Sequence, residues 1–333
     1  MSTRAPTRET AEHLRFLHTV ASLYHLEGKT QADIADLLGV SRTRVLRALQ
    51  EARTAGIVQI SVVDPSGTDE SLAHELVAAF GLASAVVVAG HPDDVVFTRR
   101  RVGAAAARYL ADTLPDAATL GLGWGRTLHE VTQALDSDRR RSLRVVPLMG
   151  GLGQVAPSFQ VHDMARVVSE RLGGSWTPFY LPGIVDDADT HAALLATADA
   201  APVRAAWSSL DVALFGIGDV DLSRELQVLF ATYLSEDVKH RMRRSGVVGD
   251  VCMRFLRADG TAVDDALRHL LAIELDDLRR TPQKVAVACG AEKASAILSA
   301  IRGELVDTLV TDVSAARALL RAGAGHGPKE ERS

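Results

Sequence analysis

The sequence predicts an α/β protein that has a small helical head at its N-terminus and a larger body built on a mainly parallel sheet. The head is indicated by residues 30–60, where helix-turn-helix spacing is followed at once by an alternating apolar segment. The body is indicated by short apolar strands that alternate with amphipathic helices. With 333 residues, 47% of them hydrophobic, the chain has room for two or three domains and is too apolar to be largely disordered.

The head should contain two short helices joined by a glycine turn. Thr30 and Asp33 have the spacing of a capping box, so a helix should begin after Thr30. Gly39 tolerates the left-handed backbone of a tight turn, and Ser41 is an N-cap for the next helix. Apolar residues expected on the inner side of the first helix and in the turn are Ala32, Ile34, Ala35, Leu37, Leu38 and Val40. A preceding helix over 8–26 should pack behind the pair.

The second helix of the pair is the candidate DNA reader. Its apolar residues recur at three- and four-residue spacing and should face inward: Val45, Ala48, Leu49 and Ala52. The N-terminal end of such a helix enters the major groove, so the expected DNA contacts are Ser41, Arg42, Thr43, Arg44 and Arg47. Arginine pairs bidentately with guanine, whereas serine and threonine bond base edges or phosphates. We expect Arg42 and Thr43 on bases, and Arg44 and Arg47 on phosphates or bases.

A wing and a domain boundary should follow this helix. Gly56 is expected to end the helix, and residues 57–63 have the pattern of a strand that could form the wing of a winged helix. We expect a DNA-binding domain at 1–63, a linker at 64–71, a second domain at 72–322 and a disordered tail at 323–333. Residues 1–63 carry a net charge of +2 and the rest carries −7, so only the head should attract nucleic acid. In the alternative interpretation, the arginines form only a solvated face of a helical pair inside an α/β domain.

The body should be a parallel sheet with helices on its faces. The expected strands are 85–88, 119–122, 143–147, 175–180, 212–217, 249–255, 285–288 and 308–311. The expected helices are 69–80, 95–113, 127–136, 160–172, 190–199, 202–209, 223–235, 265–272, 292–301 and 313–321.

Three glycine-rich turns are expected after strands, at 120–127, 147–151 and 216–219. Ligands of open parallel sheets bind at the carboxyl ends of the strands, so these turns should converge on one cleft. The first turn opens a helix, whose backbone amides could hold a phosphate. Its third glycine is misplaced for a dinucleotide fingerprint, and the acidic residue that binds ribose is missing. We therefore expect no cofactor.

Several segments together resemble one bacterial family, the SorC/DeoR-type sugar-binding transcriptional regulators. The matching segments are SRTRVLRALQEARTAGIVQI, LGLGWGRTL, PLMGGLG, the helix start at 160–165, FGIG, GDVCMRF with ADG after it, and CGAEKASAILSAIRGELVDTLVTD. The resemblance covers most of the chain, from residue 10 to residue 320. The WGRT segment and the K-x-x-A-I-L-x-A-x-R-G run are specific in combination.

The resemblance implies a winged-helix head and an effector domain related in fold to sugar-phosphate isomerases and CoA transferases, without their catalysis. It implies a homotetramer, a dimer of dimers, that binds operator DNA and changes its operator affinity when it binds a sugar, polyol or sugar phosphate. The implied effector contacts are Gly123, Trp124, Gly125, Arg126 and Thr127 at the phosphate or sugar end, Gly150 and Gly151 on the floor, Gln160 on sugar hydroxyls, and Asp250 and Lys293 at the other end.

The chain departs from the family pattern at three positions. Met149 stands where bisphosphate-binding relatives tend to carry a basic residue, His162 replaces a frequent Asn, and Arg257 replaces an Asp before A-D-G. The missing cation argues against a bisphosphate and leaves a monophosphate or an uncharged polyol open.

Two other functions are compatible with the sequence: a sugar-phosphate isomerase or lyase with an appended head, and a DNA-binding assembly protein whose body only oligomerises. An enzyme would need a base near a labile proton or a lysine poised for a Schiff base. Candidate groups exist in Asp219, Asp250, His162 and Lys293, but no pair has a spacing that demands catalysis. We therefore assign no catalytic residue.

Neither a metal site nor a membrane segment is expected. The acidic cluster Asp186, Asp187, Asp189 and His191 has the composition of a solvated loop. Cys252 and Cys289 stand apart and should simply be buried, as in a reducing compartment. No apolar run is long enough to cross a bilayer and the first residues lack a signal region, so the cytoplasm is the expected location.

Overall fold

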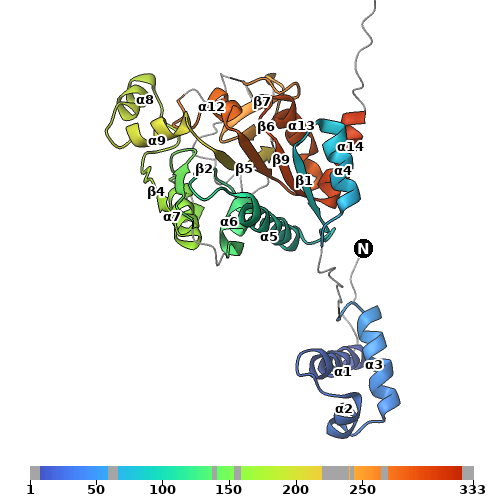
Figure 1. Ribbon diagram of the computed structural model, residues 1–333. Coiled ribbons are helices and arrows are strands. Elements are labelled where there is room, and N and C mark those ends of the chain that lie inside the picture. The colour runs from blue at the N-terminus through green and yellow to red at the C-terminus, as the bar shows by residue number, and fades with distance from the viewer. Residues whose placement is uncertain are drawn as a thin grey trace, which may run out of the picture. The chain divides into compact units, whose positions relative to one another are not determined.

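The computed structural model describes residues 8–58, 67–136, 141–153, 159–219, 240, 244–263 and 269–324 (Figure 1). The chain divides into two compact units, Met1–Ser66 and Gly67–Ser333, which we call the head and the body. Part of the expected linker 64–71 belongs to the body, because Thr68 pairs with Val88 and helix α4 begins at Glu70. The expected helix 223–235 lies outside the described residues, as does the expected tail after Ala324.

The head contains the three predicted helices, α1 (Arg8–His25), α2 (Gln31–Leu38) and α3 (Arg42–Thr54). Thr30 and Asp33 form a reciprocal capping box, and the Ser41 side chain accepts from the backbone N–H of Arg44. Gly39 has a φ of 62°, in the left-handed region that favours glycine. The two caps and the turn are therefore confirmed. Most of the expected wing, from residue 59 on, lies outside the described residues.

The core of the head is formed by one stripe from each helix. Its buried members are Leu17, Val20, Ala21 and Leu23 of α1, Ile34 and Ala35 of α2, and Val45, Ala48, Leu49 and Ala52 of α3. The expectation that Ala32 and Leu37 also face inward was wrong, since both are exposed, Leu37 by 63%. At about 100° per residue, each lies more than a quarter-turn from the centre of the stripe formed by Ile34, Ala35 and Leu38.

The body is built on a mainly parallel sheet. Its strands are β1 (Ser84–Val88), β2 (Thr119–Leu122), β3 (Arg144–Pro147), β4 (Ser175–Trp176), β5 (Val212–Asp219), β6 (Val247–Val251), β7 (Arg254–Arg257), β8 (Gln283–Val287) and β9 (Thr308–Asp312). The order β1-β9-β8-β5-β2-β3-β4 is parallel throughout, and the antiparallel hairpin β6–β7 pairs with the end of β5.

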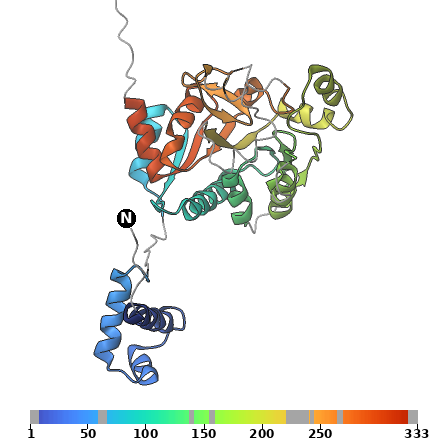
Figure 2. The same cartoon turned by 180° about the vertical axis from the view of Figure 1, so that it is seen from behind.

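Helices cover both faces of this sheet, so the body has three layers (Figures 1 and 2). One face is covered by α5 (Val95–Thr113), α6 (Arg126–Ala134) and α7 (Val161–Leu172). The other is covered by α4 (Glu70–Phe80), α9 (Ala201–Trp207), α12 (Leu275–Arg280), α13 (Ala294–Arg302) and α14 (Val313–Ala324). Successive strand residues alternate between the two cores, as Phe215 and Leu214 do. Helix α8 (Ala188–Leu195) has no buried residue. No helix of the described chain combines the length and apolar character needed to span a bilayer.

Two expected elements of the body were wrong. The single strand 249–255 is a hairpin, because Cys252 and Met253 turn the chain with left-handed φ angles of 49° and 65°. Such angles are uncommon in residues other than glycine, so the sequence gives no sign of this turn. The described part of the expected helix 265–272 is extended, and Leu270 and Ala272 pair with Ile184 and Met149.

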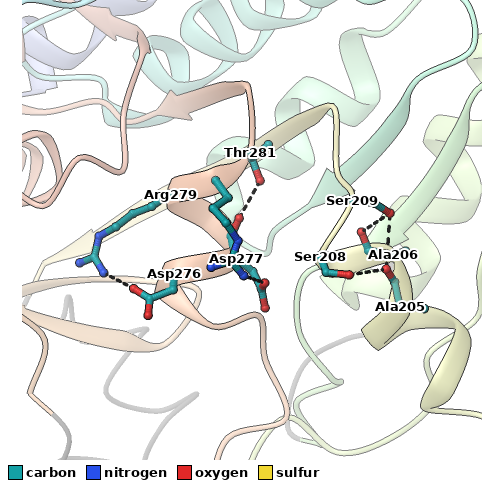
Figure 3. A network of polar contacts seen from close by, with 9 residues as sticks. Ala205, Ala206, Ser208, Ser209, Asp276, Asp277, Arg279 and Thr281 are labelled. Atoms are coloured by element: carbon teal, nitrogen blue, oxygen red, sulfur yellow. Dashed lines mark hydrogen bonds and ion pairs between the residues drawn. The ribbon is translucent and has the colours of Figure 1, made fainter.

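Helix α12 was not predicted, because it has only six residues. It is held by local polar contacts, in which Arg279 pairs with Asp276, and Arg280 with Asp277 (Figure 3). The Thr281 hydroxyl donates to the Asp277 carbonyl and helps to close its last turn.

Helices α5 and α6 cross very closely at Gly103. A Cβ atom there would lie 2.6 Å from the Cβ atom of Glu130 and 2.8 Å from its carbonyl carbon. These neighbours belong to the main chain and the first side-chain atom, which cannot rotate away. The crossing sets the position of α6, whose N-terminus lies at the candidate ligand site described below.

We expect Gly103→Ala to lower the free energy of unfolding of the body by about 1–2 kcal/mol. We expect a cost in the upper part of the usual overpacking range, about 2–3 kcal/mol, because the clashing atoms of Glu130 are fixed to the main chain, and the better helix propensity of alanine offsets about 1 kcal/mol. Urea unfolding of the full chain, followed by tryptophan fluorescence, measures the loss, since Trp124, Trp176 and Trp207 all lie in the body. Arg108→Ala, at an exposed position of the same helix, is the control. Equal stability of Gly103→Ala and wild type would show that the two helices separate freely.

Candidate ligand site and nucleic-acid interface

The five residues predicted to contact DNA all lie at the start of α3, and all are exposed: Ser41, Arg42, Thr43, Arg44 and Arg47. The buried stripe on the other side of α3 is the predicted one. The five residues are not equivalent. Ser41 caps the helix, and the guanidinium carbon of Arg44 lies 5.1 Å from the ring centre of Phe16 in α1. Arg44 is thereby turned toward α1.

The first glycine turn connects β2 to α6 and has the geometry expected of an anion site. The Gly123 N–H donates to the Leu214 carbonyl, and a Cβ atom on Gly123 would lie 2.9 Å from that of Phe215. Gly125 has a φ of 146°, which side-chain-bearing residues rarely adopt, and no side chain caps α6. Trp124, Arg126 and Thr127 are half-buried around this helix start. A helix N-terminus without a side-chain cap favours an anion through its amides and its dipole.

Cys289 and Asp312 join this helix start to the next strand ends, and sequence reasoning missed both. Burial and nearby Asp312 raise the pKa of the Cys289 thiol, and the neighbouring Thr127 hydroxyl acts in the lowering direction. The Asp312 carboxylate is 1% exposed and accepts from the N–H groups of Gly290 and Ser314 at 2.7 and 2.9 Å. Their positions in the sequence could have indicated them, because Asp312 ends β9 and Cys289 lies two residues after the end of β8, and ligands of parallel sheets bind at such strand ends.

Lys293, Asp219 and Asp250 form a charged group at the end of β5. The Lys293 ammonium lies 2.9 Å from the Asp219 carboxylate and donates to the Ile217 carbonyl at 3.0 Å. Asp250 in β6 accepts from the Met253 N–H at 3.0 Å. Burial raises the pKa of Asp250, Lys293 and the Met253 N–H act in the lowering direction, and Asp219 adds to the increase. The family resemblance implies Asp250 and Lys293 at this site, whereas Asp219 was expected only in the third glycine turn and as a candidate group of an enzyme.

The expected third glycine turn, 216–219, is wrong, because these residues continue β5 as a strand. Their glycines allow close approach instead. A Cβ atom on Gly218 would lie 1.8 Å from an Asp250 carboxylate oxygen, and one on Gly216 would lie 3.4 Å from the Trp124 carbonyl oxygen. Small residues here let β5 approach the Trp124 main chain and the Asp250 carboxylate closely.

The second glycine turn is closely tied to neighbouring backbone. The Gly150 N–H donates to the Leu271 carbonyl and the Gly151 N–H to the Leu181 carbonyl, both at 2.8 Å. The Gln160 amide donates to the Leu152 carbonyl at 2.6 Å and accepts from the Leu152 N–H at 3.2 Å. Gln160 therefore stabilises the loop at Leu152 by hydrogen bonds to its main chain, and the N–H groups of Gly150 and Gly151 already have main-chain acceptors.

The first glycine turn, the charged group at the end of β5 and the second glycine turn meet through the β6–β7 turn. Gly183 packs against the Gly150 carbonyl and against the Met253 side chain, since a Cβ atom there would lie 2.9 and 3.1 Å from them. Met253, Met149 and Trp124 belong to one apolar cluster. The structure thus brings the predicted effector residues to one edge of the sheet, and Gln160 borders it from the Leu152 loop.

The acidic cluster of 186–191 has structural partners. Asp187 caps α8 by accepting from the N–H and hydroxyl of Thr190, and these bonds lower its pKa. His191 contacts the Leu270 carbonyl through Nε2 at 3.0 Å. Within the described ranges, no three metal-ligating side chains come together.

Arg257, the third departure from the family pattern, holds the hairpin together. Its guanidinium donates to the carbonyls of Ser245 and Ala262 at 3.1 and 2.8 Å. Where the family pattern has a carboxylate, this chain therefore has a guanidinium that bonds two loop carbonyls.

Comparison with known proteins identifies relatives along nearly the whole chain. The family model described as "Putative sugar-binding domain" matches residues 65–321. The transcriptional regulator LsrR of Enterobacter sp. (strain 638) is 33% identical over 304 residues, covering 90% of this chain and 91% of LsrR. The sorbitol operon regulator of Klebsiella pneumoniae is 30% identical over 319 residues, covering 94% of this chain and all of that regulator. The crystal structure of full-length SorC, the sorbitol operon regulator of Klebsiella pneumoniae, superposes with a TM-score of 0.71 at 29% identity, covering 92% of this chain and 98% of SorC.

The raised pKa of Asp250 predicts a pH-dependent effect of Asp250→Asn. The folded protein holds this proton more tightly than the unfolded chain, so ionisation costs stability as pH rises from about 3.8 through the higher folded pKa. Asp250→Asn removes that cost and should gain stability over wild type across this window. The difference should stay constant at higher pH. Urea unfolding at a series of pH values measures it.

Asp259→Asn is a control of opposite sign. Hydrogen bonds from Thr261 lower the pKa of exposed Asp259, so its carboxylate adds stability that is present above the unfolded pKa and lost as pH falls. Asp259→Asn should therefore lose stability relative to wild type as pH rises. Parallel pH curves for wild type and Asp250→Asn would contradict the enclosed position of Asp250.

Proposed function

Because the chain belongs to the family of transcriptional regulators that carry this sugar-binding domain, we propose that it binds operator DNA through α3 under the control of a sugar, polyol or sugar phosphate. The effector binds at the sheet edge formed by the ends of β2, β5 and β8. Protomers assemble as a homotetramer, a dimer of dimers, which places pairs of heads on DNA half-sites separated by whole helical turns.

One observation carries the effector part of the proposal. The N-terminus of α6, which no side chain caps, lies at the same sheet edge as a fixed group of one ammonium and two carboxylates. Helix amides suit a phosphate or another electron-rich oxygen, and carboxylates suit the hydroxyls of a sugar. The proposed contacts at the first end are Gly123, Trp124, Gly125, Arg126 and Thr127, with Asp250 and Lys293 at the other end and Gly150, Gly151 and Gln160 bordering them.

The DNA part is supported by the head. Its recognition helix exposes arginines at its N-terminal end, and the Ser41 cap and Gly39 turn set the angle between α2 and α3. The head is net positive and the rest of the chain net negative, so phosphate backbone is attracted to one unit and repelled by the other.

Control of operator binding by the effector requires only a modest coupling free energy between the two sites. An effector that weakens operator binding a hundredfold must favour the non-binding arrangement by about 2.7 kcal/mol, a normal value for coupled sites. We do not extend the proposal to a sugar-phosphate enzyme, because Lys293 is held between Asp219 and a main-chain carbonyl and the relatives named above are regulators.

A thermal-shift screen of the full chain against matched pairs of free and phosphorylated sugars and polyols tests the effector site. We expect one member of one such pair to stabilise the body. Whether that member is free or phosphorylated shows whether the start of α6 binds a hydroxyl or a phosphate. For a phosphorylated ligand, Arg126→Met should remove a cation and weaken binding about tenfold, which reduces the stabilisation at saturating ligand by about 1.4 kcal/mol. Arg108→Ala is the control, since Arg108 is exposed on α5. Absence of any stabilisation would overturn the effector part.

Arg42→Ala tests the recognition helix. We expect it to lose sequence preference on DNA from its own promoter while ligand stabilisation of the body is retained, because head and body are separate units. Competition between promoter and unrelated duplex at one fixed salt concentration measures the preference. Full operator affinity in this variant would remove Arg42 from the residues that read sequence.

A further inference from the structure

We infer that Leu46 and Gln50, neither of which was predicted, read A·T base pairs beside the arginine contacts, and that Arg44 does not read sequence. This inference rests on the proposed function, namely that α3 binds DNA. We thereby assign the face of α3 that reads bases and the base pairs that this face contacts in the DNA.

Contacts within the head fix the orientation of α3. The stripe of Val45, Ala48, Leu49 and Ala52 is buried. The side toward α1 carries Arg44 and Glu51, because Arg44 stacks over Phe16 and Glu51 lies 3.0 Å from the His13 ring. Two sides of the helix are thereby assigned to the head itself.

The remaining surface of α3, as far as Gln50, consists of two ridges. Residues four apart lie on one ridge of an α-helix, so Arg42, Leu46 and Gln50 form the first and Thr43 and Arg47 the second. All five are exposed. The first ridge rises about 1.5 Å per residue and so extends for about 12 Å. That length spans three to four base pairs at about 3.4 Å each, so one ridge can meet several base edges.

The residue types on this ridge match the edges of A·T pairs in the major groove. A glutamine amide bonds bidentately to adenine N6 and N7, and an apolar side chain contacts the thymine methyl group. Leu46 is 44% exposed and lies between Arg42 and Gln50. Leu26 and Leu37 are also exposed, so exposure alone does not assign Leu46; its place on the ridge does. Arg42 and Arg47 on either side suit guanine and phosphate.

Arg44 has a different role in this arrangement. Its guanidinium is held against the Phe16 ring, a cation–π geometry, on the side of α3 that faces α1. We assign it to phosphate contact at the groove edge. Loss of Arg44 should weaken binding to all DNA sequences equally. It should also reduce the slope of the logarithm of the binding constant against the logarithm of salt concentration by about one.

The test is selection from a randomised duplex library by the full chain at one fixed salt concentration. Wild type should select a motif that contains at least one A·T pair beside a G·C pair. Leu46→Ala and Gln50→Ala should each lose preference at an A·T position, by about 5- to 150-fold for the glutamine pair. Gln50→Glu should change the preferred base there toward cytosine, whose N4 amine donates to a carboxylate. Arg44→Ala should select the wild-type motif with lower affinity.

Leu26→Ala is the matched control, because Leu26 is 83% exposed and lies outside α3. It should select the wild-type motif with unchanged affinity. If Leu46→Ala and Gln50→Ala also select that motif unchanged, the assignment of these two residues is overturned while the proposed function stands. If wild type enriches no sequence at all, the proposed function falls and the assignment falls with it. Selection of a new motif by Arg44→Ala would overturn the assignment of Arg44.

Discussion

The body depends on a balance of charge at the end of β5. One ammonium and two carboxylates come together there, and an isolated charge in such a place would cost several kcal/mol. The ion pair of Lys293 with Asp219 and the main-chain donor to Asp250 offset that cost. They also fix three separate elements, since Lys293 belongs to the short 3₁₀ helix η2 (Ala291–Lys293), Asp219 to β5 and Asp250 to the β6–β7 hairpin. Gly218 leaves room for the Asp250 carboxylate beside β5, and the hairpin turn supplies the Met253 N–H that donates to it.

The same arrangement gives the sheet edge two chemically different ends. At one end, the start of α6 offers amides beside Thr127 and the buried Cys289–Asp312 pair. At the other, carboxylates and an ammonium are already bonded to each other and to main chain. A polar ligand can exchange hydrogen bonds with such a preformed group without large rearrangement, which favours binding of a neutral polyol portion there. Nothing in this geometry demands a reaction, and binding alone is sufficient for a regulator.

The stability of the head is limited by the size of its core, because three short helices supply few apolar residues. Each helix contributes one stripe to a single small core, so caps and polar contacts contribute a larger share of its stability. The contacts of α3 with α1 serve this purpose and at the same time orient the helix. Stability and recognition are therefore linked in the head: the residues that hold α3 against α1 determine which residues remain to face DNA.

Local sequence determines most of the secondary structure of this protein. The caps at Thr30 and Ser41, the turn at Gly39 and most helices and strands of the body follow from hydrogen-bonding capacity and periodicity, which act over a few residues. The strand ends and the first two glycine turns also predicted the edge of the sheet where we propose that the ligand binds, because parallel strands place their carboxyl ends together. The resemblance to a known family added Asp250 and Lys293, which no local pattern marks.

Only the tertiary structure decided the partners of these residues. Glycines 216 and 218 have the composition of a turn, but pairing with β6 and β8 makes them strand, and the left-handed Cys252–Met253 turn replaces an expected strand. Asp312 and Cys289 enter the site through contacts with residues far away in sequence. Arg44 differs from Arg42 and Arg47 only because Phe16 lies beside it. The physical reason is the same in each case: periodicity assigns a residue to a face, whereas burial, close approach and ion pairing depend on what the rest of the chain packs against that face.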